Sequence, residues 1–141
     1  MKVNWGAVLL ATIVNFGFGF FWFATFATPW RAGLQISAEE LQQSLQHPSF
    51  WPRLIAILCS IGMALGISWV MGMACKFGLV RGLLAGLMVG IVAALAMITE
   101  LAFEMHSAVF MCISAGYPLF GCMLMGMVIG IWKPKDVAEA A

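Results

Sequence analysis

The feature that most constrains this chain is the absence of charged residues from four long stretches. No Asp, Glu, Lys or Arg lies between Lys2 and Arg31, or within residues 54–75, 82–99 and 107–132. Each stretch reaches the ~18 apolar residues that mark a candidate membrane helix. Because hydrocarbon cannot satisfy backbone N–H and C=O groups, each stretch has to be a helix that bonds to itself. We therefore predict an all-α membrane protein, a single domain over residues 1–141, with four transmembrane helices in a bundle at about 5–27, 53–75, 80–103 and 107–132.

Composition excludes several classes of protein. Only 9% of the residues are charged, whereas a soluble domain has about 25%. The net charge is +1 and no basic stripe is present, so the sequence does not indicate nucleic-acid binding. It contains no P-loop, dinucleotide fingerprint, H-E-x-x-H or G-x-S-x-G motif. We therefore expect no catalytic residue, no cofactor and no nucleic-acid partner, and a chain whose main partner is the lipid bilayer.

The positive charges predict the orientation. An even number of spans puts both ends on one side, and short loops rich in Lys and Arg stay in the cytoplasm. The side that holds both termini carries five cations, and the other side carries Arg31 and Arg53. Both termini, including the tail 133–141, are thus predicted to be cytoplasmic, and the 28–52 segment external. The five cytoplasmic cations are Lys2, Lys76, Arg81, Lys133 and Lys135.

The external segment contains a candidate helix of its own at about residues 38–46. Ser37 can cap it, and Glu40 stands at the reciprocal position of a capping box. Leu41 and Leu45 are one turn apart, so they share a face and make the helix amphipathic. This helix is predicted to be an ordinary packing device of a long loop, and the alternative is a lid or a partner-docking element.

Small residues four apart predict where the spans pack, because they let membrane helices approach closely. Such ladders occur in the second, third and fourth spans. Asn15, the one strongly polar residue deep in the first span, is predicted to bond to a neighbouring helix. The predicted packing residues are Asn15, Gly62, Gly66, Gly82, Gly86, Gly90, Gly116, Gly126 and Gly130.

Three residues near the external end are the candidates for chemistry. Glu100 and Glu104 are one turn apart, and continuing the glycine stripe of the third span places both on its packed face. With His106 they could bind a divalent cation or relay protons. The simpler interpretation is that the carboxylates reach water at the helix end or pair with Arg53 or Arg31. Eleven methionines and four cysteines would suit Cu(I), but no C-x-x-C or Met-x-x-Met spacing supports a site.

A scattered set of residues along the chain forms a recognisable pattern. Its members are Asn4, Trp5, Gly19, Phe21, Trp22, Phe23, Pro29, Trp30, Gly33, Ala115, Gly116, Tyr117, Met125, Gly126, Gly130 and Trp132. The pattern resembles that of a family of small bacterial four-helix membrane proteins of unknown function. The resemblance implies the same fold, a bacterial inner membrane and no established activity. In that family a histidine often follows the Gly-Tyr pair, where this chain has Pro118.

Two functions of different classes follow from these features. The first is a non-catalytic accessory or structural subunit, or a self-associating bundle, which predicts a homo-oligomer or a larger membrane complex. The second is a transporter of a small solute, protons or metal ions that uses Glu100 and Glu104. Transporters usually have broken helices in repeated halves, a pattern that this sequence lacks. An enzyme is the third and least supported class.

Overall fold

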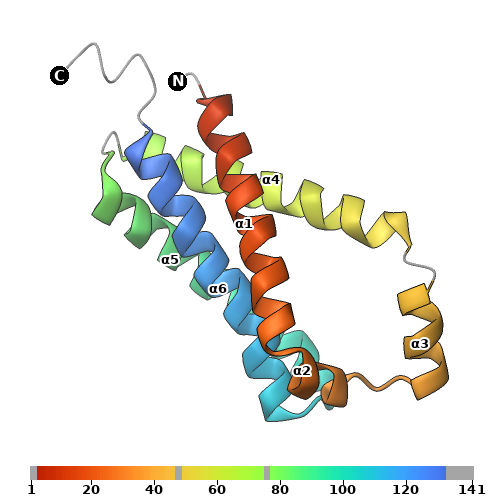
Figure 1. Ribbon diagram of the computed structural model, residues 1–141. Helices are drawn as coiled ribbons and strands as arrows, with labels where there is room; N and C mark the ends of the chain where they lie inside the picture. Colours follow the sequence, from red (N-terminus) through yellow and green to blue (C-terminus); the bar gives the residue numbers. More distant parts are fainter. Residues whose placement is uncertain (1–2, 47–48, 75–76, 133–141) are drawn as a thin grey trace.

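The computed structural model describes residues 3–46, 49–74 and 77–132, and within them every regular element is a helix (Figure 1). The predicted cytoplasmic tail, 133–141, lies outside the described residues. The all-α fold class is confirmed. The helices are α1 (Trp5–Thr25), α2 (Ala27–Gly33), α3 (Ala38–Gln46), α4 (Phe50–Met73), α5 (Leu79–Phe103) and α6 (Ala108–Ile131).

Four of these helices are long and apolar enough to cross a membrane. They are α1, α4, α5 and α6, with 21, 24, 25 and 24 residues. At about 1.5 Å per residue each exceeds the roughly 30 Å of a hydrocarbon core. The first predicted span is shorter than expected, because the chain breaks at Phe26 and α2 then continues as a separate short helix. The fold is that of a multi-pass membrane protein.

Helices α5 and α6 form a hairpin whose two backbones touch. A Cβ atom built on Gly82 would fall on the carbonyl oxygen of Gly126, and one built on Gly86 would fall on that of Cys122. The approach is reciprocal, since a Cβ on Gly126 would meet the carbonyl of Gly82. Only glycine allows this distance, and it brings Cα–H groups against carbonyl oxygens across the interface.

The other side of α6 receives α1. The indole of Trp22 lies over Gly116, and the ring of Tyr117 lies over Gly19. Trp22 Nε1 also donates a hydrogen bond of 3.0 Å to the carbonyl of Ile113. An aromatic ring on one helix therefore fills the space that a missing side chain leaves on the other. As a result α6 packs against α1, α2, α4 and α5.

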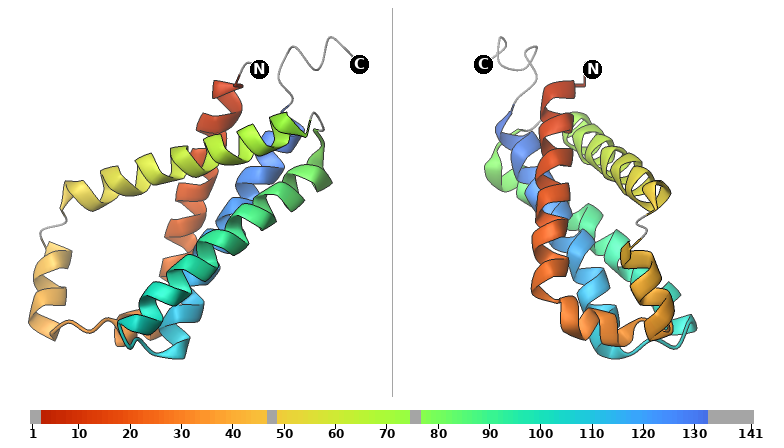
Figure 2. Two further views of the ribbon diagram at one scale, coloured as in Figure 1. Left: turned by 180° about the vertical axis from the view of Figure 1, so that it is seen from behind. Right: turned by 45° about the vertical axis from the view of Figure 1, so that its right-hand side comes forward.

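Helix α4 is packed along only part of its length. Its buried residues start at Ser60 and include Ala64, Ile67 and Met71. Between Phe50 and Cys59 every described residue is exposed except the half-exposed Leu54. Figure 2 shows α4 crossing the other helices near its end and leaning away from them toward α3.

The predicted packing of Gly62 and Gly66 against the other spans is wrong. Nothing in the described part of the chain lies within 4 Å of a Cβ built on either residue. Gly62 is two residues from both Ser60 and Ala64, and at about 100° per residue it faces the opposite side of the helix. The small-residue ladder of α4 thus points outward.

The loop helix α3 has the predicted cap. Ser37 Oγ accepts a hydrogen bond from the Glu40 backbone N–H (3.2 Å), and the Glu40 carboxylate accepts from the Ser37 N–H and hydroxyl, both at 3.0 Å. These two bonds lower the pKa of Glu40. Among the described residues α3 packs against no other helix, and the side chains of Leu41 and Leu45 are not described.

We expect Gly86→Leu and Gly126→Leu to destabilise the bundle by about 1–3 kcal/mol or more, the usual result of overpacking. Each leucine would have to displace a backbone segment of the facing helix. Unfolding in mixed detergent micelles measures the effect, and Gly17→Leu is the matched control because its new side chain enters open space. Equal unfolding midpoints for Gly86→Leu and Gly17→Leu would show that α5 and α6 do not meet at their glycines.

Candidate functional site

A polar cluster lies in the middle of the bundle, where three helices meet. Asn15 of α1 donates a hydrogen bond of 2.9 Å to Ser60 Oγ of α4 and one of 3.2 Å to the Tyr117 hydroxyl of α6. Asn15 is 1% exposed and Ser60 2%. The interhelical bond predicted for Asn15 is therefore present, and Asn15 bonds to two neighbouring helices rather than one.

Glycine makes room for this cluster on α6. The amide oxygen of Asn15 lies directly against Gly121, where any side chain would displace it. That oxygen is buried and has no hydrogen-bond partner among the described groups. Asn, Ser and Tyr are all neutral near pH 7. The cluster therefore anchors three helices without placing a charge in the membrane.

A groove opens beside the cluster, between α1, α2 and the raised half of α4. Its volume is about 500 Å³, within the roughly 300–1,000 Å³ of small-molecule sites. Arg31 is the one charged residue among the described residues that line it. The lining residues are Phe16, Gly19, Phe20, Phe23, Ala24, Ala27, Trp30, Arg31, Ala56 and Tyr117.

Aromatic rings connect the cluster to the end of the bundle where α2 lies. Tyr117 contacts Phe23 with ring centroids 5.3 Å apart, and Phe23 contacts Trp30 at 5.2 Å. Trp30 stacks on Phe110 at 6.1 Å, and Phe110 stacks on His106 at 4.4 Å. Aromatic pairs at such distances add to the stability that burial provides. The row fixes α2 against α6, and three of its members, Tyr117, Phe23 and Trp30, also line the groove.

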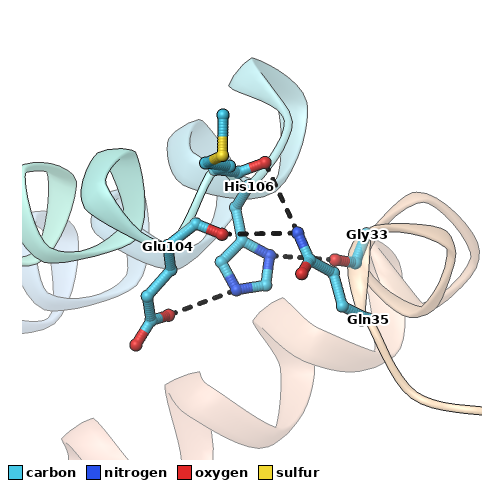
Figure 3. A network of polar contacts seen from close by, with 5 residues as sticks. Gly33, Gln35, Glu104 and His106 are labelled. Atoms are coloured by element: carbon cyan, nitrogen blue, oxygen red, sulfur yellow. Dashed lines mark hydrogen bonds and ion pairs between the residues drawn. The ribbon is translucent and has the colours of Figure 1, made fainter.

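The same end of the bundle is held by polar contacts between α2 with the residues after it and the turn before α6 (Figure 3). His106 Nδ1 is 3.1 Å from the Gly33 carbonyl oxygen, and its Nε2 is 3.2 Å from a Glu104 carboxylate oxygen. Gln35 Nε2 donates to the carbonyls of Glu104 and Met105 at 3.5 and 3.4 Å. Both imidazole nitrogens face acceptors, so a neutral ring can donate to only one of them and a protonated ring donates to both.

The structure separates the three residues predicted to bind metal or relay protons. Glu104 and His106 meet, but Glu100 is exposed, and among the described residues no ion pair joins it to Arg31 or Arg53. The described residues hold no group of three or more His, Cys, Asp or Glu side chains that could bind a metal ion. The soft ligands Cys122 and Met63 touch at 3.8 Å between sulfur atoms, as ordinary buried neighbours do.

The prediction that Glu100 lies on the packed face of the third span is wrong. The buried positions of α5 are Gly82, Gly86, Gly90 and Ala94, spaced by four. A four-residue step advances about 40° beyond one full turn, so the contact line rotates around the helix. The sequence prediction assumed a straight stripe parallel to the helix axis and did not include this rotation. At the level of Glu100 the packed face has therefore turned away from the side on which Glu100 lies.

The family comparison agrees with the fold. The class defined by the four long apolar helices is the multi-pass α-helical membrane proteins. Residues 6–130 match the model of the family described as "Protein of unknown function (DUF1761)", and the chain belongs to this family. No match was found among curated proteins or among solved structures.

Sequence reasoning missed three residues of the polar cluster and its setting: Ser60, Tyr117 and Gly121. A signal was present for two of them. Tyr117 is the single tyrosine of the chain, and Ser60 is a polar residue within an apolar span. Both have hydroxyl groups that need a partner inside a membrane. Gly121 had no such signal, because it belongs to no four-residue ladder.

We expect Asn15→Ala to lower the free energy of unfolding by about 1–3 kcal/mol, because it leaves the buried Ser60 hydroxyl and the partly buried Tyr117 hydroxyl without their donor. Thr12→Ala is the matched control: Thr12 is buried on the same helix, but its hydroxyl bonds only to Val8 O at 2.9 Å within that helix. Unfolding curves of both variants measure the difference. An Asn15→Ala chain no less stable than Thr12→Ala would contradict the role given to the cluster.

Proposed function

We propose that this protein is a non-catalytic, self-associating subunit of a bacterial inner membrane, and that two copies pair through the outward face of α4. The observation that carries the proposal is the unused ladder of Cys59, Gly62 and Gly66. Of these, Gly62 and Gly66 have only open space around them in the described part of the chain, and Cys59 is exposed.

Pairing through α4 would have the same physical cause as the contact between α5 and α6. Lipid tails are as apolar as leucine, so membrane helices associate through close packing at small residues. The ladders of α5 and α6 are occupied by each other. The ladder of α4 offers the same close approach and has no partner among the described residues of its own chain. A second copy of α4, related by a two-fold axis, supplies an identical ladder.

The external half of α4 supports the same conclusion. From Phe50 to Cys59 the helix presents large apolar side chains that are mostly exposed, among them Trp51 at 68% exposed and Leu58 at 58%. Lipid can cover such a surface, but a helix that leans away from its own bundle gains packing only from another protein. Association through α4 therefore requires no rearrangement of the other three long helices.

We further propose that both termini are cytoplasmic, since Arg31 and Arg53 are outnumbered by the cations on the other side. The transport alternative gains no support from Glu100 and Glu104, which are both exposed at the external end of α5. A catalytic role likewise has no cluster of acid, base and nucleophile to support it among the described side chains.

The orientation predicts which engineered cysteines react on intact cells. In a chain stripped of its own cysteines, Gln43→Cys should react with a membrane-impermeant maleimide, and Val137→Cys should react only after the cells are opened. Both positions are polar or terminal, so neither change alters the bundle. Reaction at position 137 but not at position 43 on intact cells would show that the orientation is the opposite of the proposed one.

The pairing predicts a disulfide between two copies in the native membrane. A chain that keeps Cys59 as its single cysteine should form a covalent dimer on mild oxidation, visible on a non-reducing gel. Adding Gly62→Leu should lower the dimer fraction at least about fivefold, the equivalent of about 1 kcal/mol of overpacking. The subunit itself should stay folded, because that position is open.

Two results would contradict the pairing. The control is a single cysteine at Val92→Cys, which is 68% exposed on the lipid side of α5 and should not form the dimer. Equal dimer yields at positions 59 and 92 would mean random collision. An unchanged yield after Gly62→Leu would mean that the ladder is not the contact.

A further inference from the structure

The groove beside the polar cluster has the length of one membrane leaflet. It runs from Phe16, near the middle of α1, past Phe20 and Phe23 to Trp30 and Arg31 on α2. Phe16 and Thr25, the end of α1, are nine residue steps apart, which corresponds to about 14 Å at 1.5 Å per residue. Half of a hydrocarbon core is about 15 Å. The groove therefore extends from the bilayer midplane to the headgroup level.

The chemistry of the groove changes along this length. Its deep part is lined by Phe16, Phe20 and the partly buried Tyr117. Its outer end carries Arg31, and none of the described residues that line it is acidic. Among the described residues Arg31 forms no ion pair. A guanidinium group binds phosphate oxygens through two parallel hydrogen bonds and keeps its charge at any physiological pH.

We propose that the groove binds one anionic phospholipid of the leaflet on the α2 side, with its phosphate on Arg31 and an acyl chain against Phe16, Phe20 and Phe23. The lipid enters sideways from the bilayer, because the raised half of α4 leaves this side open. Its occupant is a lipid rather than protein because the charge lies at the headgroup level and the apolar walls end at the midplane. The proposal does not rest on the pairing of α4, since the groove is lined on that helix by Ala56, which lies about 120° around the helix from Gly62.

The test is native mass spectrometry of the purified full chain with added lipid. The probes are phosphatidylglycerol and phosphatidylcholine with the same acyl chains. We expect one phosphatidylglycerol molecule to be retained, with about a fivefold preference over phosphatidylcholine, as one cation near a membrane surface provides. Arg31→Gln should remove this preference. Ala24→Phe, which fills the groove at an exposed position, should reduce retention of both lipids.

The matched control is Arg53→Gln, which removes the same charge at the same end of the bundle but outside the groove. It should leave the preference unchanged. A preference that survives Arg31→Gln, or that falls equally with Arg53→Gln, would overturn the proposal, as would a wild-type chain that retains neither lipid. So would a disulfide between two copies that each carry Ala24→Cys as their single cysteine, because protein would then occupy the groove.

Discussion

The arrangement of this protein depends on the contact between the backbones of α5 and α6. In a bilayer no hydrophobic force drives one apolar helix onto another, so the gain must come from dispersion and from weak Cα–H to oxygen contacts. Both fall off steeply with distance. Gly82, Gly86 and Gly126 allow the two helices to approach until carbonyl oxygens lie where side chains would begin. The short turn at residues 104–107 brings the two ladders into register.

The hairpin then determines how α1 docks. With one side of α6 occupied by α5, its other side presents Gly116 and Gly121, and each receives a specific side chain of α1: Trp22 and Asn15. In exchange α1 presents Gly19 to the ring of Tyr117. This alternation of rings and gaps fixes both the rotation and the height of α1. It also holds Asn15 within hydrogen-bonding distance of Ser60 on α4. The packing of α1 on α6 thus places the polar cluster, and the cluster in turn links both helices to α4.

The sequence predicted these features to different extents, for physical reasons. The long helices follow from charge-free length alone, because the membrane leaves the backbone no alternative. The ladder of Gly82, Gly86 and Gly90 correctly indicated a packed face. The equally regular pair Gly62 and Gly66 does not pack within the described part of the chain. Glycine spacing shows that a helix can approach another helix closely, but it does not show whether that other helix belongs to the same chain. Tyr117 and Gly121 could not be assigned, since their roles depend on which side of α6 faces α1.

Helix α4 is the helix through which the bundle meets its surroundings. Its inner half is held by Ser60, Ala64 and Ile67, its outward ladder is free, and its raised half opens the groove toward the lipid. Both proposed roles, pairing and lipid binding, use surfaces that the α5–α6 hairpin and its partner α1 leave uncovered. They therefore require that the glycines of α5 and α6 pack against each other, and that Gly62 and Gly66 of α4 pack against neither helix.

Solid-state nuclear magnetic resonance of the glycine-¹³C-labelled protein in bilayers tests this requirement most directly. Through-space cross-peaks should join Gly82 to Gly126 and Gly86 to Gly126, and Gly62 and Gly66 should show none to any glycine of α5 or α6. Absence of the Gly82–Gly126 cross-peak, or a cross-peak from Gly62 to a glycine of α6, would contradict the account.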